Sequence, residues 1–300
     1  MKNILFTTCL VLTFASFAQT GPGGVGNSAN NVVWLDGNIV TVGTNPYIAT
    51  WPDQSGNGNN FVQATSSRQP SIVTYYGFKG LRFDGGDWLR TGGGIGALDA
   101  NTHTQYVIYN GYTANHVGIL HESSYTQSNQ FLRTYRNYGN VAAFVLNSTL
   151  GTVLNSTTNS SAFQIISSIW DGNAQTFDSY KDGTSFGSKG GANGSPTGNY
   201  LNTIGASSSG SYRFNGDMGE VIFYNTVLNS AQRIIVDNYL SSKFKVTISN
   251  DMYAYDAALT HQYGLIGIGQ EADGNNLTAQ GKGIVEFSVG SMNNGDYIFT

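Results

Sequence analysis

The sequence predicts an all-β fold, a sandwich of two antiparallel sheets, and three observations carry this prediction. Short runs of alternating apolar and polar residues recur along the chain, separated by segments rich in Gly, Asn and Ser. Charged residues make up only 11% of the chain, against an average of about 25%. Gly accounts for 39 of the 300 residues, above the usual share of about 7%. This composition is typical of a turn-rich β protein with a nearly neutral surface.

The alternating runs define the expected strands. A two-residue turn is predicted at Asp182-Gly183, because this pair supplies the positive φ values that a tight hairpin needs. No long helical pattern interrupts the strands, which favours stacked antiparallel sheets. The clearest strands are expected at 32–35, 61–62, 105–109, 131–135, 141–146, 163–170 and 221–224.

One short helix is predicted after Asn225. Asn229 can cap its first turn, and Gln232 stands three residues later, which is the capping-box spacing. The apolar residues that follow recur at helical spacing, so they form a stripe that can cover an edge or end of the sandwich. These residues are Ile235, Val236, Tyr239, Leu240 and Phe244.

The segment Trp51–Asn60 consists mostly of turn-forming residues. Asp and Asn side chains close turns by bonding to the backbone, and Gly tolerates positive φ. Short apolar runs flank the segment, with Trp34 in the one that precedes it. We therefore expect a rigid hairpin cap rather than a catalytic loop, and we expect the tryptophans to act as core or hairpin anchors. The tryptophans are Trp34, Trp51, Trp88 and Trp170.

Four pieces of sequence together resemble a known family. They are the turn motif Asp53-Gln54-Ser55-Gly56-Asn57-Gly58, the stretch Gly80–Gly85 with Trp88-Leu89, the strand Gly219-Glu220-Val221-Ile222-Phe223-Tyr224-Asn225, and the helix after it. Their order and spacing resemble the laminin-G-like, concanavalin A-like jelly-roll modules of secreted bacterial adhesins and polysaccharide-handling proteins. The resemblance covers residues 31–245 and implies a jelly roll that ends in a helix. It specifies the fold better than the ligand, because one such fold serves many functions.

The N-terminus has the order of a secretory signal peptide. Lys2 precedes an apolar run from Ile4 to Phe14, and the small residues Ser16 and Ala18 follow. This run is shorter than the roughly 20 residues that span a bilayer. We therefore expect residues 1–18 to be removed and the protein to be secreted or displayed at the cell surface. Cys9, the only cysteine, lies in this segment, so the mature chain can form no disulfide.

The remaining chain divides into three parts by its composition and hydrophobic pattern. Residues 19–30 form a Gly-rich leader that we expect to be flexible, and residues 31–245 form the jelly roll. Residues 246–300 start a β-rich extension that resembles those trailing such modules in proteins exported by type IX secretion. Because the chain stops directly after the apolar run Tyr297–Phe299, we expect it to be a piece of a longer multidomain protein.

Charge and motif spacing argue against several activities. The net charge of −4 and the lack of a Lys or Arg cluster make nucleic acid an unfavourable partner. The Glu-x-Asp-x-x-Glu strand of concanavalin A-like glucanases is absent, and in a regular strand Asp217 and Glu220 would point to opposite faces. The spacing of His116, His121 and Glu122 matches no zinc site, so a structural role is favoured for them.

Two binding sites are predicted. Oxygen-bearing side chains lie at turns that the resemblance places on one rim of the sandwich, which fits a structural calcium site; each could instead cap its own turn. Tyrosines in polar loops could stack on sugar rings, although ordinary packing is the alternative. The candidate calcium ligands are Asp53, Asn57, Asp84, Asp217 and Glu220, and the candidate glycan-binding residues are Tyr112, Tyr125 and Tyr138.

The sequence therefore predicts a secreted module that binds a carbohydrate or a cell-surface or matrix partner, as adhesins do, and performs no catalysis. Two alternatives remain. One is a polysaccharide hydrolase of the concanavalin A-like glucanase class with an atypical acid pair. The other is a structural spacer domain without a ligand.

Overall fold

The computed structural model describes residues 21–40, 46–75, 77–99, 101–111, 118–125, 131–137, 140–147, 150–156, 162–191, 198–253, 264–281 and 286–300. Within this part, no helix is long and apolar enough to cross a membrane.

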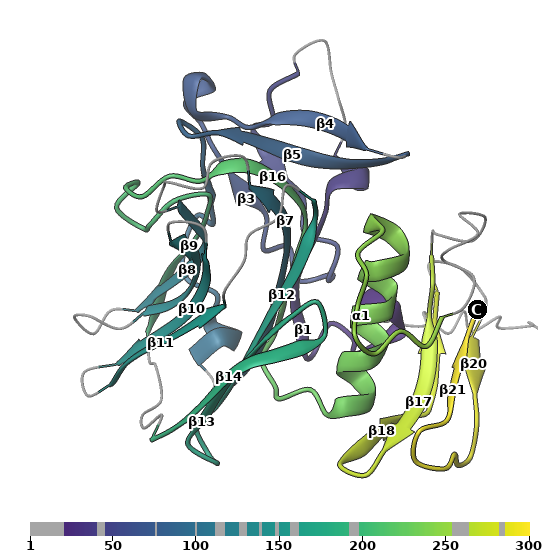
Figure 1. The fold of residues 1–300 in the computed structure, drawn as a ribbon. Coiled ribbons are helices and arrows are strands. Elements are labelled where there is room, and N and C mark those ends of the chain that lie inside the picture. Colours follow the sequence, from purple (N-terminus) through teal and green to yellow (C-terminus); the bar gives the residue numbers. More distant parts are fainter. Residues whose placement is uncertain are drawn as a thin grey trace, which may run out of the picture.

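The body of the described residues is a sandwich of two antiparallel sheets, as the sequence predicts (Figure 1). The first sheet has the strand order β14-β13-β12-β7-β16-β5-β4, and β1 pairs with β16 beside this path. Its strands are β1 Asn31–Asp36, β4 Ser71–Tyr75, β5 Phe78–Asp84, β7 Thr102–Gly111, β12 Gln164–Asp171, β13 Thr176–Lys181, β14 Thr184–Gly190 and β16 Asn215–Tyr224.

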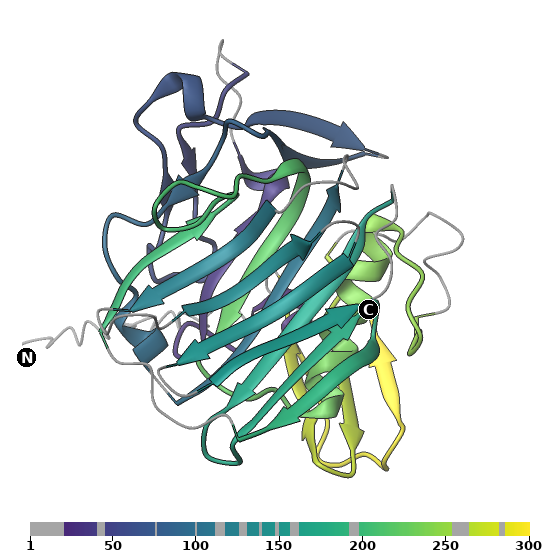
Figure 2. The ribbon, with the colours of Figure 1, turned by 60° about the vertical axis from the view of Figure 1, so that its left-hand side comes forward.

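The second sheet has the order β11-β10-β9-β8-β15-β6-β3-β2, and Figure 2 turns it toward the viewer. The short strands β2 and β3 form a hairpin on either side of the turn at residues 52–60. Its strands are β2 Thr50–Trp51, β3 Phe61–Val62, β6 Leu89–Arg90, β8 Gly118–Tyr125, β9 Phe131–Asn137, β10 Asn140–Asn147, β11 Leu150–Ser156 and β15 Asn199–Ile204.

Apolar side chains from both sheets meet between them and form the main core. Val107 and Val221 of the first sheet share a buried cluster with Leu120 and Ile204 of the second, and all four are fully buried. Because alternate residues of a strand face the same side, the predicted alternation places one such set in this interior.

The helix α1, Ser230–Phe244, covers the outer face of the first sheet and creates a second apolar layer. Its stripe residues Ile235 and Leu240 pack in one cluster with Ile222 and Tyr224 of β16. Strands β1 and β16 are therefore buried on both faces, which explains why they read as nearly continuous apolar runs. The predicted capping box is confirmed: Asn229 Oδ1 accepts from Gln232 N at 2.9 Å, and Gln232 Oε1 accepts from Asn229 N at 3.2 Å.

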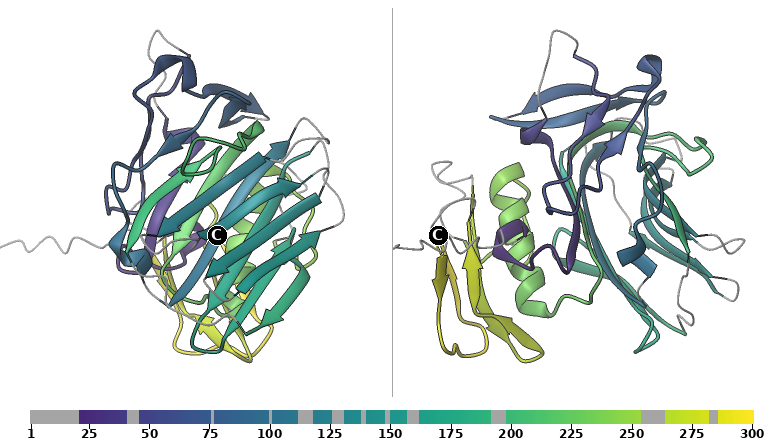
Figure 3. Two further views of the ribbon diagram at one scale, coloured as in Figure 1. Left: turned by 90° about the vertical axis from the view of Figure 1, so that its left-hand side faces the viewer. Right: turned by 180° about the vertical axis from the view of Figure 1, so that it is seen from behind.

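The described C-terminal residues form two small sheets on the far side of α1. The helix contacts β17 and β18 there, so it lies between the sandwich and the small strands (Figure 3). The order in the larger of these sheets is β18-β17-β21, and β19 pairs with β20. The strands are β17 Gly267–Glu271, β18 Gly274–Asn276, β19 Thr278–Gln280, β20 Glu286–Ser288 and β21 Tyr297–Phe299.

The expectation of a flexible Gly-rich leader is wrong for residues 21–25, which are buried. The 3₁₀ turn η1, Pro22–Gly24, packs against α1 and β19. Gly23 and Gly24 adopt φ of 67° and 82°, and a Cβ at Gly24 would meet Ala279 at 2.6 Å. The glycines here permit close packing rather than flexibility, which composition alone does not distinguish.

Both predicted turns are confirmed. Asp182 and Gly183 have φ of 50° and 77°, and they join β13 to β14 as a two-residue hairpin. In the Trp51–Asn60 segment, Gly56 and Gly58 have φ of 90° and 72°. The predicted tryptophan anchors are also confirmed, because none of the four is more than 6% exposed.

The carboxylate of Asp53 organises this segment. Its Oδ1 accepts from the backbone N–H groups of Trp34 and Ser55, both at 2.9 Å. Its Oδ2 accepts from Ser55 Oγ at 2.7 Å and from Asn59 N at 2.9 Å. One side chain thus closes the turn and ties it to β1.

Replacing Asp53 by Asn should destabilise the protein by about 2 kcal/mol. Both carboxylate oxygens now accept hydrogen bonds, and in the variant the amide NH₂ would face N–H or O–H donors in place of one of these oxygens. Urea denaturation measures the change. Asp178→Asn on β13 is the matched control, with an expected change within about 0.5 kcal/mol. Equal losses in both variants would contradict the role assigned to Asp53.

Burial of Asp237 on α1 predicts a pH-dependent stability. Its side chain is 4% exposed, and this desolvation raises its pKa to about 7, although Arg233 and Asn250 act in the opposite direction. An unfolded Asp ionises near pH 4. Between about pH 4 and 7 the native state therefore binds more protons than the unfolded state, so stability falls as pH rises.

The variant Asp237→Asn should abolish this contribution, because an amide stays neutral throughout. We expect it to be more stable than wild type at pH 8 and about equal at pH 4, as measured by urea midpoints across this range. Identical pH profiles for the two proteins would contradict the prediction.

Candidate functional site

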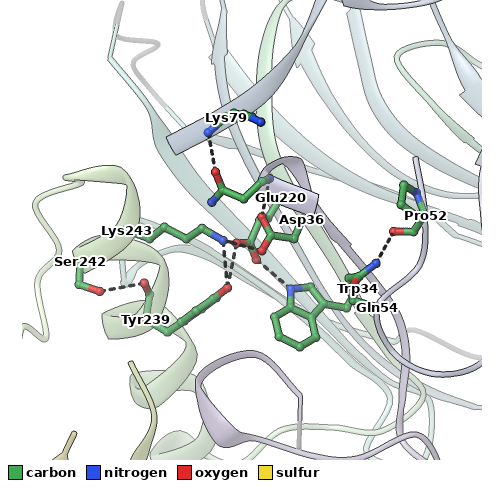
Figure 4. A network of polar contacts seen from close by, with 10 residues as sticks. Trp34, Asp36, Pro52, Gln54, Lys79, Glu220, Tyr239, Ser242 and Lys243 are labelled. Atoms are coloured by element: carbon green, nitrogen blue, oxygen red, sulfur yellow. Dashed lines mark hydrogen bonds and ion pairs between the residues drawn. The ribbon is translucent and has the colours of Figure 1, made fainter. Parts of the chain in front are cut away.

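A buried ionic cluster under α1 forms the floor of the candidate site (Figure 4). Tyr239 and Lys243 are four residues apart on α1, so both project toward the first sheet. The Lys243 side chain is only 5% exposed, and its Nζ lies 2.9 Å from Asp36 Oδ2. The same Nζ forms an ion pair with Glu220 Oε1.

Glu220 is held from several directions. Its Oε1 also accepts from Tyr239 OH at 2.9 Å, and its Oε2 accepts from Trp34 Nε1 at 3.1 Å. Strand β1, strand β16 and helix α1 thus converge on one carboxylate. Its partners leave it no access to bulk water, and its side chain is 1% exposed.

Asp36 ends β1 and begins the 3₁₀ turn η2, Gly37–Ile39. Its Oδ1 accepts from Asn38 N at 2.8 Å, which caps the turn. Asn38 Oδ1 in turn accepts from Lys79 N at 2.7 Å. The position of Asp36 is therefore fixed by its own turn and by strand β5.

The cluster brings two carboxylates to one ammonium, and all three side chains are at most 5% exposed. Burial raises the pKa of Glu220, although Lys243 opposes this shift. Burial also opposes the charge of Lys243, but Glu220 and Asp36 together raise the pKa of its amine. Two ionised carboxylates beside one ammonium would leave a net negative charge buried, and a proton on one carboxyl removes it.

A cavity of about 380 Å³ lies above this floor. Trp34 and Tyr239 contribute aromatic rings, which meet edge to face with centroids 6.4 Å apart. Asn38 and Gln280 contribute amides, and Ile39, which is 38% exposed, lies where the wall reaches the surface. The remaining lining residues are Gly21, Gly23, Asp36, Gly77, Lys243, Gly264, Leu265, Ile266 and Gly281.

The expectation that Asp217 and Glu220 point to opposite faces is wrong. A β-bulge between Met218 and Glu220 adds a residue to β16 and shifts the alternation. Asp217 bonds to Tyr75, which packs in the layer under α1, and Glu220 lies under α1 as well. Both are already paired with cations, since Arg82 Nε lies 2.9 Å from Asp217 Oδ1.

The five candidate calcium ligands do not form one group. Asp53 and Asn57 bond within their own turn and to β1 or the residues before it, and Asn57 Nδ2 donates to Ser28 O and Asn31 O at 3.0 and 3.1 Å. Asp84 Oδ1 accepts from Gly86 N at 2.6 Å. Among the residues described, no three His, Cys, Asp or Glu side chains are grouped so that they could hold a metal ion. The calcium site stays a prediction.

Of the candidate glycan-binding tyrosines, Tyr112 and Tyr138 lie outside the described residues. Tyr125 is the last residue of β8 and pairs with Asn199 of β15. At the other end of β8, Gly118 pairs with Arg136. The role of the three tyrosines in glycan binding therefore also stays a prediction.

The structural interpretation of His121 and Glu122 is confirmed, whereas His116 lies outside the described residues. His121 Nδ1 lies 3.1 Å from Gln105 Oε1 in the core, and burial lowers its pKa to about 3. Glu122 Oε2 accepts from Arg133 Nε at 2.7 Å.

The cavity and the roles of Asp36 and Lys243 were not predicted from the sequence. A signal was present, because Lys243 lies next to Phe244 on the helix and Asp36 ends an apolar strand. A Lys on a buried helix face requires a buried acid as its partner. Glu220, inside an apolar strand, gave the complementary signal.

Comparisons with known proteins identify solved structures of similar fold, but they assign the chain to no family. No family model matches the chain, and no curated protein has a similar sequence. Among solved structures, the sandwich is similar to domain 4 of the arabinanase AbnA from Geobacillus stearothermophilus, solved in complex with arabinotriose. That match has a TM-score of 0.51 and 13% identity, and it covers 62% of this chain and 90% of that one.

A second similar structure is a carbohydrate-binding module, CBM40 of a Ruminococcus gnavus sialidase, bound to sialyllactose. Its TM-score is 0.40 with 14% identity, over 52% of this chain and 94% of that one. At 13% identity, the likeness to the arabinanase domain establishes the architecture alone. The chain has a two-sheet β-sandwich fold like that of the arabinanase domain.

Proposed function

We propose that this chain is a glycan-binding module of an exported, adhesin-like protein and performs no chemistry on its ligand. The cavity beside α1 carries the proposal. Its volume of about 380 Å³ falls within the range of roughly 300–1,000 Å³ typical of small-molecule sites. Its aromatic rings supply apolar contact for a sugar, and the amides of Asn38 and Gln280 supply hydrogen bonds to hydroxyl groups.

The fold supports this assignment in general terms. A sandwich of the same architecture holds arabinotriose in the arabinanase domain. The turn motif at Asp53 and the strand at Glu220 also resemble those of laminin-G-like modules in sequence, and we propose that the chain is related to these modules. Residues 1–18 would direct export, and the extension after residue 245 would belong to a larger protein of the type IX secretion class.

The arrangement of the acids supports a module without hydrolase activity. A retaining hydrolase needs one carboxyl free to donate a proton and a second free to attack the sugar. Asp217 pairs with Arg82, and Glu220 pairs with Lys243. Both side chains are also at most 1% exposed, so neither can reach a glycosidic bond.

Filling the cavity should abolish binding. The variant Gly281→Phe adds a ring to the lining, and a Cβ there has ordinary contact only with Ile266 at 3.9 Å. We expect wild type to bind a glycan on an array and in calorimetry, and Gly281→Phe to bind at least tenfold more weakly, about 1.4 kcal/mol. Gly290→Phe is the matched control, because a Cβ at Gly290 meets nothing within 4 Å and the residue does not line the cavity.

Other outcomes identify what is wrong. Equal binding by both Phe variants would reject the cavity, and a loss in a Tyr112→Ala, Tyr138→Ala double variant would then assign the site to the loops. Release of reducing sugar from mixed polysaccharides would support the hydrolase alternative. An empty array with every protein would leave the spacer alternative.

The predicted calcium site is tested by thermal unfolding. Calcium at ten times its dissociation constant would stabilise the native state by about 1.4 kcal/mol, so the midpoint should rise in millimolar calcium and fall with chelator. Asp84→Asn should remove that response, while magnesium controls for ionic strength. An unchanged wild-type midpoint would eliminate calcium as a ligand of this protein.

A further inference from the structure

The cluster of Lys243, Asp36 and Glu220 buries a second carboxyl group beside the ammonium, which a simple ion pair does not need. The amine and the two carboxyl groups share one enclosure, with side chains 5%, 4% and 1% exposed. Rings of Tyr239 and Phe244 lie near the ammonium, with centroids 5.5 and 5.6 Å from Nζ. Each of the three side chains is therefore almost entirely removed from bulk water.

The amine is in position to reach the carboxyl carbon of Asp36. Nζ lies 2.9 Å from Asp36 Oδ2. The opposite oxygen, Oδ1, accepts from Asn38 N at 2.8 Å. A backbone N–H on that oxygen polarises the carbonyl and stabilises negative charge that develops there during attack. The two oxygens are thus differentiated: one is held by a backbone donor, and the other faces the amine.

Glu220 is placed to move protons between the two groups. Its Oε1 bonds directly to the Lys243 ammonium, and Tyr239 and Trp34 fix its orientation. Burial favours its protonated form, so it can receive a proton as well as return one. Because Glu220 and Asp36 raise the pKa of the amine, Nζ becomes nucleophilic only after Glu220 has taken a proton from it.

We propose that Lys243 and Asp36 condense to an intramolecular isopeptide bond, with Glu220 as the proton-transfer residue. The neutral Nζ attacks Cγ of Asp36 and forms the C–N bond. Glu220 accepts protons from the nitrogen and delivers them to Oδ2, which leaves as water when the C–O bond breaks. Two of the three ammonium hydrogens depart in that water, the third stays on the amide nitrogen, and Oδ1 becomes the amide oxygen. No oxidant or cofactor takes part.

This bond would join the end of β1 to the last turn of α1. It would act as a covalent crosslink in a chain whose only cysteine is Cys9. The reaction goes beyond the glycan-binding proposal and does not depend on it, since it requires no ligand.

Mass spectrometry of the purified, denatured protein tests the proposal. The intact mass should be lower than the sequence mass by one water. Trypsin should fail to cleave after Lys243, so the peptide 234–245 should appear covalently joined to the peptide that ends at Arg68 and contains Asp36. The joined pair is decisive, because cyclisation of Asp36 onto the nitrogen of Gly37 also releases water but joins no peptides.

Variants separate the roles. Lys243→Arg keeps the positive charge and should show two separate peptides with no loss of water at this site. Glu220→Gln keeps the shape of the side chain and should leave the crosslink unformed or at least tenfold slower to form; an undiminished rate would overturn the role of Glu220. Wild-type protein with the full sequence mass, or with cleavage after Lys243 following long incubation at neutral pH, would overturn the isopeptide bond itself.

Discussion

The position of α1 depends on the buried carboxylate of Glu220. Strand β16 is paired with β1, β5 and β7, so a side chain on β16 is connected to most of the first sheet. Lys243 and Tyr239 from the helix both bond to Glu220, and Trp34 of β1 does so from the other side. Apolar contacts alone are not directional, whereas these bonds fix the helix in one register. The helix in turn forms the surface on which η1 and the C-terminal strands pack.

Glu220 also explains why a bulge occurs in β16. Without the extra residue between Met218 and Glu220, the alternation would turn Asp217 or Glu220 into the apolar interior between the sheets, where an unpaired carboxylate is strongly unfavourable. The bulge keeps both acids on the outer face. Gly219 sits at this point, where a Cβ would collide with the ring of Phe244. The bulge in β16, the missing side chain of Gly219 and the contact with Phe244 of the helix therefore depend on one another.

Much of the fold could be predicted from the sequence because its determinants are local. The Asn229 cap, the Asp182-Gly183 hairpin and the Asp53 turn each lie within a few residues, where spacing reveals the bonds. The site could not be predicted in the same way. Asp36, Glu220 and Lys243 are separated in sequence, and strand alternation fails at a bulge that only Gly219 marks in the sequence. The packing of residues 21–25 could not be predicted for a related reason: Gly24 lies against Ala279, a contact that no local pattern reveals.

The packing of η1 against β19 has a consequence for the order of events during synthesis. Gly24 needs Ile266 and Ala279 as neighbours, yet the ribosome adds those residues long after it. At about 5–20 residues per second, the first segment waits roughly 10–50 seconds for its partners. The nascent protein therefore cannot complete the packing of η1 until residue 279 has emerged from the ribosome.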